Sequence, residues 1–234
     1  MRSLLIAIAA LAALPVAAAE YTAGPVANGG TISGKITYNG KPPAAKKIAT
    51  NKDPKVCGTS RDDETFVVES NGGIKNVVVY LSDIKAGKKM EGDMKPVLNQ
   101  KGCHYEPMVQ VVPLHSTLQV KSSDPILHNV HSFLNGSTMI NFAMPPQPGL
   151  VLTKKLDKAG GEQLKCDVHS FMTGGIFVAA NPYYALTGPD GSFEIKDVPA
   201  GNYTIATWHQ AAGPLSQPVS VTAGGKTEFS GKVK

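Results

Sequence analysis

The feature that most constrains this chain is a succession of short runs rich in β-branched and aromatic residues, divided by glycine, proline, asparagine and aspartate. Residues 31–39 and 74–81 are two such runs, and Asn39-Gly40 closes the first as a turn. Runs with the apolar spacing of an amphipathic helix are nearly absent. The pattern predicts an all-β fold.

Residues 1–19 have the order of a secretory signal peptide. Arg2 gives the charged start, residues 4–14 form an apolar run, and Ala17-Ala18-Ala19 places small residues before Glu20. The apolar run is shorter than the ~20 residues that a membrane-spanning helix needs. We expect cleavage after Ala19 and an exported protein, most simply in a bacterial periplasm. The alternative is a retained N-terminal anchor.

The charge of the chain is mildly basic. The formal net charge is +5, and loss of Arg2 with the signal peptide lowers it to +4. Such an excess favours an acidic protein partner. It is far from the charge of a nucleic-acid-binding domain, and no basic stretch is interleaved with aromatic residues.

Residues 166–172 (Cys-Asp-Val-His-Ser-Phe-Met) place a thiol, an imidazole and a thioether within one short segment. A mononuclear thiolate-copper site uses two histidines and one cysteine in a near-trigonal set, with a weak axial methionine. Cys166, His169 and Met172 are therefore candidate copper ligands. The alternative is a chance cluster, with Cys166 in a disulfide and Met172 filling a gap in the core.

The second histidine must come from elsewhere, and residues 124–131 (Asp-Pro-Ile-Leu-His-Asn-Val-His) offer two. His128 and His131 differ by an odd number of positions, so a regular strand directs their side chains to opposite faces. Only one of them is expected to reach the metal. Parity alone does not choose between the two.

The chain has three cysteines, Cys57, Cys103 and Cys166. An odd number in an exported protein leaves one unpaired, and an oxidising compartment favours a bond between the other two. If Cys166 binds metal, the simplest pairing is a Cys57–Cys103 disulfide. Three free cysteines, or a disulfide that includes Cys166, remain the alternatives.

The His128-Asn129 pair, followed by Cys166, His169 and Met172 at this spacing, resembles the cupredoxin family of blue copper proteins. The short ligand loop is most similar to that of the amicyanins and shorter than that of the plastocyanins. The resemblance covers roughly residues 105–180 and implies a Greek-key β-sandwich in which His128 is the first ligand and Asn129 steadies the site. One departure is Val168, where such loops usually carry proline.

Residues 184–205, with Asp190-Gly191 and Ala200-Gly201 turns, resemble the carboxypeptidase-regulatory or transthyretin-like β-sandwich. The early segments 30–43 and 74–81 resemble its first strands. We therefore expect a nested arrangement, in which residues 20–96 and 181–234 form this small sandwich and residues 97–180 form the cupredoxin domain. The alternative is a cupredoxin-like unit over 30–180 with a C-terminal β module over 181–234.

These features predict a periplasmic type 1 copper protein that carries one copper and transfers single electrons. The electrons would pass through a solvent-near edge of His169. The expected partners are redox proteins such as a c-type cytochrome or a periplasmic dehydrogenase. Copper storage or delivery and a non-redox surface module are the alternatives. An enzyme is not expected. The chain lacks the His-x-His pairs of a trinuclear cluster, and position 170, where a binuclear site needs a second cysteine, is Ser170.

Overall fold

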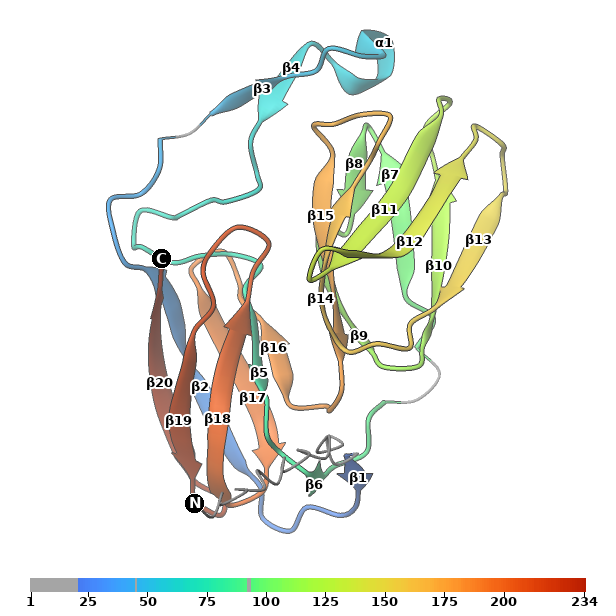
Figure 1. Cartoon of the computed structure of the whole chain (residues 1–234). Helices are drawn as coiled ribbons and strands as arrows, with labels where there is room; N and C mark the ends of the chain where they lie inside the picture. The colour runs from blue at the N-terminus through green and yellow to red at the C-terminus, as the bar shows by residue number, and fades with distance from the viewer. Residues whose placement is uncertain (1–20, 45, 92–93) are drawn as a thin grey trace, which may run out of the picture.

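The computed structural model describes residues 21–44, 46–91 and 94–234, and nearly all of its regular structure is β-strand (Figure 1). The predicted all-β sandwich fold is confirmed. The expected signal peptide over 1–19 and its cleavage position after Ala19 lie outside the described residues. Within the described ranges, no helix has the length and apolar character needed to cross a membrane.

One sandwich, here called the central sandwich, is built from residues 97–179. Its first sheet, ordered β13-β10-β7-β8, contains β7 (Val97–Lys101), β8 (His104–Glu106), β10 (Thr117–Ser122) and β13 (Val151–Lys155). Its second sheet, ordered β12-β11-β14-β15-β9, contains β9 (Val109–Pro113), β11 (His128–Leu134), β12 (Ser137–Met144), β14 (Gly160–Lys165) and β15 (Thr173–Ala179). Apolar side chains of both sheets form one core, among them Leu98, Val120, Ile140 and Ile176.

A second sandwich, here called the terminal sandwich, combines strands from both ends of the chain (Figure 1). Its strands are β2 (Gly30–Tyr38), β5 (Val78–Leu81), β16 (Tyr184–Leu186), β17 (Ser192–Val198), β18 (Gly201–Trp208), β19 (Ser216–Val221) and β20 (Lys226–Val233). Strand β2 pairs in parallel with β20, and β5 pairs antiparallel with β16 and β18. Segments before and after the central sandwich therefore share the same sheets.

The turn before β17 shows how local sequence determines this pairing. Gly191 has φ +79°, a conformation that glycine adopts without steric cost. Asp190 Oδ1 accepts hydrogen bonds from the main-chain N–H and the hydroxyl of Ser192. Beyond the turn, β17 alternates in burial, so Phe193 and Ile195 point into the core.

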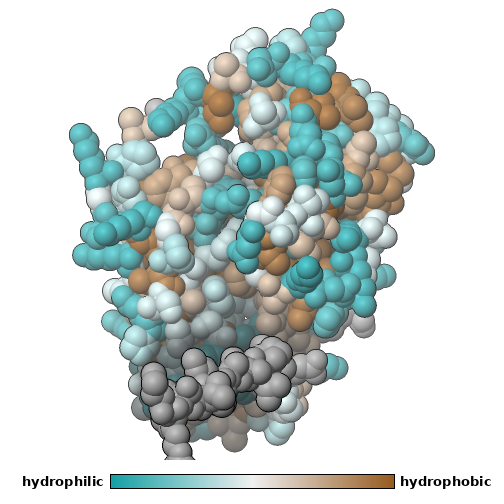
Figure 2. Space-filling model, in the orientation of Figure 1, coloured by the Kyte–Doolittle hydropathy of each residue, from teal (hydrophilic) through white to brown (hydrophobic). Residues whose placement is uncertain are grey.

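The two sandwiches meet through a small apolar cluster in which Val78 of the terminal sandwich is buried with Val109 and Phe177 of the central one. The Phe177 ring lies 4.7 Å from that of Tyr80 and 6.0 Å from that of Trp208, measured between centroids. Aromatic packing thus joins the two units. On the face shown in Figure 2, hydrophobic and hydrophilic residues are interspersed over both sandwiches.

An arm, defined here as residues 46–64, extends from the terminal sandwich to the end of the central sandwich (Figure 1). It contains β3 (Lys47–Ala49), the short helix α1 (Pro54–Cys57) and β4 (Ser60–Asp62), and β3 pairs with β4. The arm is joined to the central sandwich by the predicted disulfide, which links Cys57 to Cys103 and leaves Cys166 as the free cysteine. Two further short strands, β1 (Thr22–Ala23) and β6 (Ala86–Gly87), pair in parallel elsewhere.

Candidate metal centre

The candidate ligands lie at one end of the second sheet of the central sandwich. His128 is the first residue of β11, and Cys166 directly follows β14. The chain then turns, with the Met172 N–H donating to the carbonyl oxygen of His169 at 2.9 Å, and enters β15 at Thr173. Strands β11 and β14 are paired neighbours, so their ends bring the early histidine beside the ligand loop.

The structure brings three of the predicted donor groups together in the interior. His128 Nδ1 lies 3.1 Å from His169 Nδ1, and Cys166 Sγ lies 3.9 Å from His169 Nδ1. The donor atoms of all three residues lie within 4.8 Å of one another. The residues are almost fully buried, with 0% of His128, 2% of Cys166 and 1% of His169 exposed.

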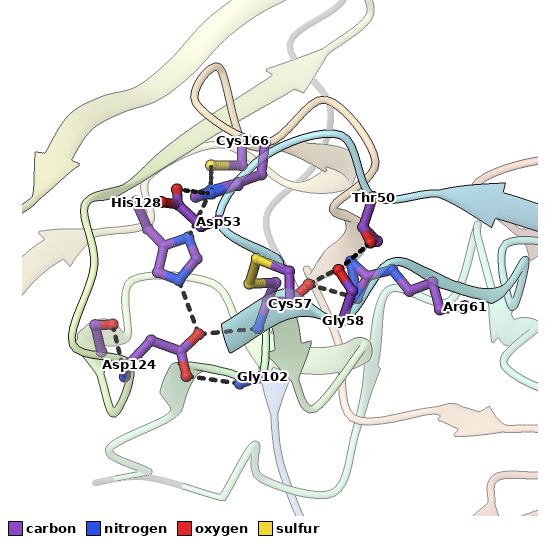
Figure 3. The surroundings of a disulfide bond; sticks show 12 residues. Thr50, Asp53, Cys57, Gly58, Arg61, Gly102, Asp124, His128 and Cys166 are labelled. Carbon is purple, nitrogen blue, oxygen red and sulfur yellow. Dashed lines mark hydrogen bonds and ion pairs between the residues drawn. A yellow bond between two sulfur atoms is a disulfide. The ribbon is translucent and has the colours of Figure 1, made fainter. Parts of the chain in front are cut away.

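Each imidazole also contacts a carboxylate through its distal nitrogen. His128 Nε2 lies 2.8 Å from Asp124 Oδ2 (Figure 3), and His169 Nε2 lies 2.9 Å from Asp53 Oδ2. A carboxylate accepts hydrogen bonds, so these contacts favour the tautomers that carry the proton on Nε2. Both Nδ1 atoms then direct lone pairs toward the same point. Such an arrangement is stabilised by a cation between them.

Burial favours the neutral, metal-binding form of His128. Desolvation lowers the pKa of His128, and the neighbouring Asp124 carboxylate only partly opposes this by favouring the charged form. Asp124 is itself fixed, since it accepts hydrogen bonds from the main-chain N–H groups of Gly102 at 2.7 Å and Cys103 at 2.9 Å. The carboxylate is therefore already oriented toward His128.

The prediction that an edge of His169 lies near solvent is wrong. The His169 side chain is 0% exposed, and the Asp53 carboxylate from the arm lies 2.9 Å from its Nε2 atom. Sequence reasoning missed Asp53 and Asp124 as partners of the two histidines. Asp124 stands four positions before His128, a spacing visible in the sequence, whereas Asp53 lies 116 positions from His169 and carries no local signal.

The cysteine and asparagine predicted at the site are linked by hydrogen bonds. The main-chain N–H of Asn129 donates to Cys166 Sγ at 3.3 Å. The Asn129 side chain accepts from the N–H of Asp167 at 3.2 Å and donates to Asn141 Oδ1 at 3.0 Å. These contacts tie β11 to the start of the ligand loop. Met172 is 1% exposed and belongs to the same apolar cluster as Cys166.

His131 lies on the other face of β11, as the parity argument predicts. Its Nδ1 lies 3.0 Å from Asp167 Oδ2 and its Nε2 lies 3.0 Å from Thr138 Oγ1. Its side chain is partly exposed, whereas that of His128 is fully buried. The structure therefore selects His128 as the histidine that faces Cys166.

The donor set suits copper. Two imidazole nitrogens and one thiol sulfur, with a buried thioether nearby in the same loop, are the ligand types of a mononuclear copper centre. One ion at ~2.0–2.1 Å from each nitrogen and ~2.3 Å from sulfur, the lengths of zinc bonds to these donors, can reach all three atoms, since these lie 3.1 and 3.9 Å apart. The residues present therefore fit the ion that their chemistry implies.

Comparisons with known proteins give structural similarity only. No protein-family model and no curated protein matches the chain. Among solved structures, a purple cupredoxin from Nitrosopumilus maritimus is 18% identical, with a TM-score of 0.32, over 36% of this chain and 100% of that one. An amicyanin variant is 22% identical, with a TM-score of 0.32, over 38% of this chain and 86% of that one.

The copper-containing nitrite reductase of Thermus scotoductus SA-01 is also similar in part. It is 20% identical, with a TM-score of 0.32, over 39% of this chain and 24% of that chain. The matched part of the nitrite reductase is thus about a quarter of its length.

Proposed function

We propose that this protein is a periplasmic type 1 copper protein that transfers single electrons between redox proteins. The observation that carries the proposal is the pair of buried Nδ1 atoms, 3.1 Å apart, that face each other beside the Cys166 thiol while both distal nitrogens are held by carboxylates. His128, Cys166 and His169 would hold the ion, with Met172 as the weak axial ligand. Copper bound there would supply a one-electron couple.

The surrounding residues limit movement of the ligands. Asp124 and Asp53 fix the two imidazole rings, and the Asn129 N–H donates to the Cys166 sulfur. A hydrogen bond to the sulfur and an apolar shell around it are features that tune the potential of such centres. A ligand set that is already in place needs little rearrangement when the charge of the site changes.

We further propose the nested domain arrangement, with residues 20–96 and 181–234 as a carboxypeptidase-regulatory-like module around a cupredoxin domain of residues 97–180. The module would serve as a scaffold or docking surface. The mildly basic charge favours an acidic partner, such as a c-type cytochrome or a periplasmic dehydrogenase. Recovery of the protein from a periplasmic fraction with Glu20 at its N-terminus would test the proposed export.

A second candidate function is copper storage or delivery. It is favoured by the burial of both imidazoles, since Asp53 covers the His169 edge through which a carrier with an exposed histidine would exchange electrons. Electron exchange with a soluble redox partner would distinguish the candidates. A carrier is oxidised and reduced rapidly with copper retained, whereas a delivery protein passes the copper to an acceptor.

The decisive experiment is titration of the protein with Cu(II), followed by visible and electron paramagnetic resonance spectra. We expect one copper per chain and an intense thiolate-to-copper band, which makes such centres blue. A Cys166→Ala variant should lose the band while retaining the Cys57–Cys103 disulfide. A wild-type protein that binds no copper, or binds it without the band, would contradict the proposed centre.

A further inference from the structure

Asp53 occupies a position at which aspartate usually caps its own helix. It is the N-cap of α1, and the N–H groups of Val56 and Cys57 donate to its main-chain oxygen at 2.9 Å. An N-cap aspartate normally accepts from the helix N–H groups with its side chain, but the Asp53 carboxylate makes no such bond. It contacts His169 Nε2 instead, at 2.9 Å. The carboxylate is therefore directed at a remote imidazole.

The disulfide fixes the segment that carries this carboxylate. Cys57 ends the same helical turn that Asp53 begins, and it is bonded to Cys103. The Cys103 N–H donates to Asp124 Oδ2, the oxygen that also contacts His128 (Figure 3). The disulfide thus bonds the segment that carries Asp53 to Cys103, whose N–H holds the carboxylate that contacts His128.

Other contacts also hold the arm against the central sandwich. Arg61 Nη1 donates to the carbonyl oxygen of Cys103 at 2.6 Å, and its guanidinium lies 4.7 Å from the centre of the Phe171 ring in the ligand loop. Thr65, which follows the arm, lies 3.1 Å from Thr173 through their hydroxyl oxygens. The arm and the residue that follows it therefore contact Phe171 and Thr173, the two neighbours of Met172 in the chain.

From these contacts we infer that Asp53 is a positioning residue of the metal centre, held at His169 by the Cys57–Cys103 disulfide, so that copper retention depends on this disulfide. The inference rests on the proposed copper centre. The carboxylate keeps His169 in the tautomer that presents Nδ1, and its negative charge favours Cu(II). Without the disulfide, the arm has only non-covalent contacts to hold Asp53 in place.

An Asp53→Asn substitution tests the role of the charge with little change in shape. Asp53 has φ 50° and ψ 51°, a left-handed conformation that asparagine also tolerates. We expect Cu(II) affinity to fall by about 10–100-fold, the usual effect of removing a partner of a metal-bound histidine, with a higher reduction potential and a changed copper spectrum. Asp62→Asn is the matched control, because Asp62 lies on the same arm and pairs with the exposed Lys47.

A Cys57→Ser, Cys103→Ser variant tests the role of the disulfide. We expect Cu(II) affinity to fall and transfer of copper to a chelator to accelerate. Adding Asp53→Asn to this variant should weaken binding by much less than it does in the wild type, because the two changes act through one contact. If Asp53→Asn weakens copper binding as much in this variant as in the wild type, the link between the disulfide and Asp53 is overturned.

Failure of the proposed function and failure of the role of Asp53 would give different experimental results. A wild-type protein without a blue centre contradicts the function itself. A blue wild-type protein and an Asp53→Asn variant with the same affinity, potential and spectrum contradict only the role of Asp53. A thiol assay that finds Cys166 as the one free cysteine of Asp53→Asn would show that this variant retains the disulfide.

Discussion

The indole of Trp208 covers the main chain at Gly175, so closely that a Cβ atom added to this glycine would lie 2.5 Å from Trp208 Cη2. Trp208 belongs to β18 of the terminal sandwich and Gly175 to β15 of the central sandwich. The same indole also covers Gly161 on the neighbouring strand β14. The absence of a side chain at these positions thus allows the two sandwiches to approach each other, and the ligand loop immediately precedes β15.

Gly175→Ala should therefore destabilise the protein. The added methyl group has no room beside the indole, and overpacking of this kind costs about 1–3 kcal/mol in the free energy of unfolding. Denaturant unfolding would measure the loss. The chain has one tryptophan, so the fluorescence of Trp208 reports on this contact directly. Gly24→Ala, at a glycine with no atom within 4 Å of the added Cβ, should change neither quantity.

Stability should fall in mild acid because of His209. Burial lowers the pKa of His209 from 6.5 to about 4. Between these two values the unfolded chain binds more protons than the folded protein, so stability is lost as the pH falls from 6.5 toward 4 and is retained above 6.5. The full loss is roughly 3 kcal/mol.

A His209→Asn variant should reduce this pH dependence. His209 Nδ1 accepts hydrogen bonds from the N–H groups of Ala211 and Ala212, and an asparagine side-chain oxygen offers a similar acceptor that does not titrate in this range. Unfolding curves of both proteins between pH 4 and 7 would check the prediction. Parallel curves would show that His209 does not cause the acid sensitivity.

The two histidines of β11 should respond differently to substitution. His128→Gln removes a nitrogen that faces Cys166 and His169, so the blue band should disappear. His131→Gln should keep the band, because the His131 side chain contacts Asp167 and Thr138 on the opposite face of the strand. Visible spectra of the two copper-loaded variants make the comparison. Loss of the band in His131→Gln alone would contradict the assignment.

The sequence predicted those parts of the site that depend on local pattern. Alternation along a strand separated His128 from His131, and the short loop grouped Cys166 with His169. The lysines and prolines of residues 41–60 indicate only a long connection, because the role of the arm arises from contacts that are distant in sequence. Asp53 meets His169 because the arm crosses to the central sandwich, where Cys57 is bonded to Cys103. The burial of His169 could not be predicted for the same reason.

Met172→Gln should lower the reduction potential of the copper centre while leaving the blue band in place. The soft thioether suits Cu(I), whereas an amide oxygen is a harder donor that suits Cu(II), and glutamine is a known alternative in the weak axial position. Met172 is 1% exposed, so the polar amide has a cost in stability that unfolding curves should record separately. Redox titration would measure the potential. Leu118→Gln is a suitable control, since Leu118 is equally buried in the same core but lies on β10 of the other sheet, outside the ligand loop. An equal fall in potential in both variants would mean that the polarity of the core, and not axial ligation by Met172, determines the reduction potential.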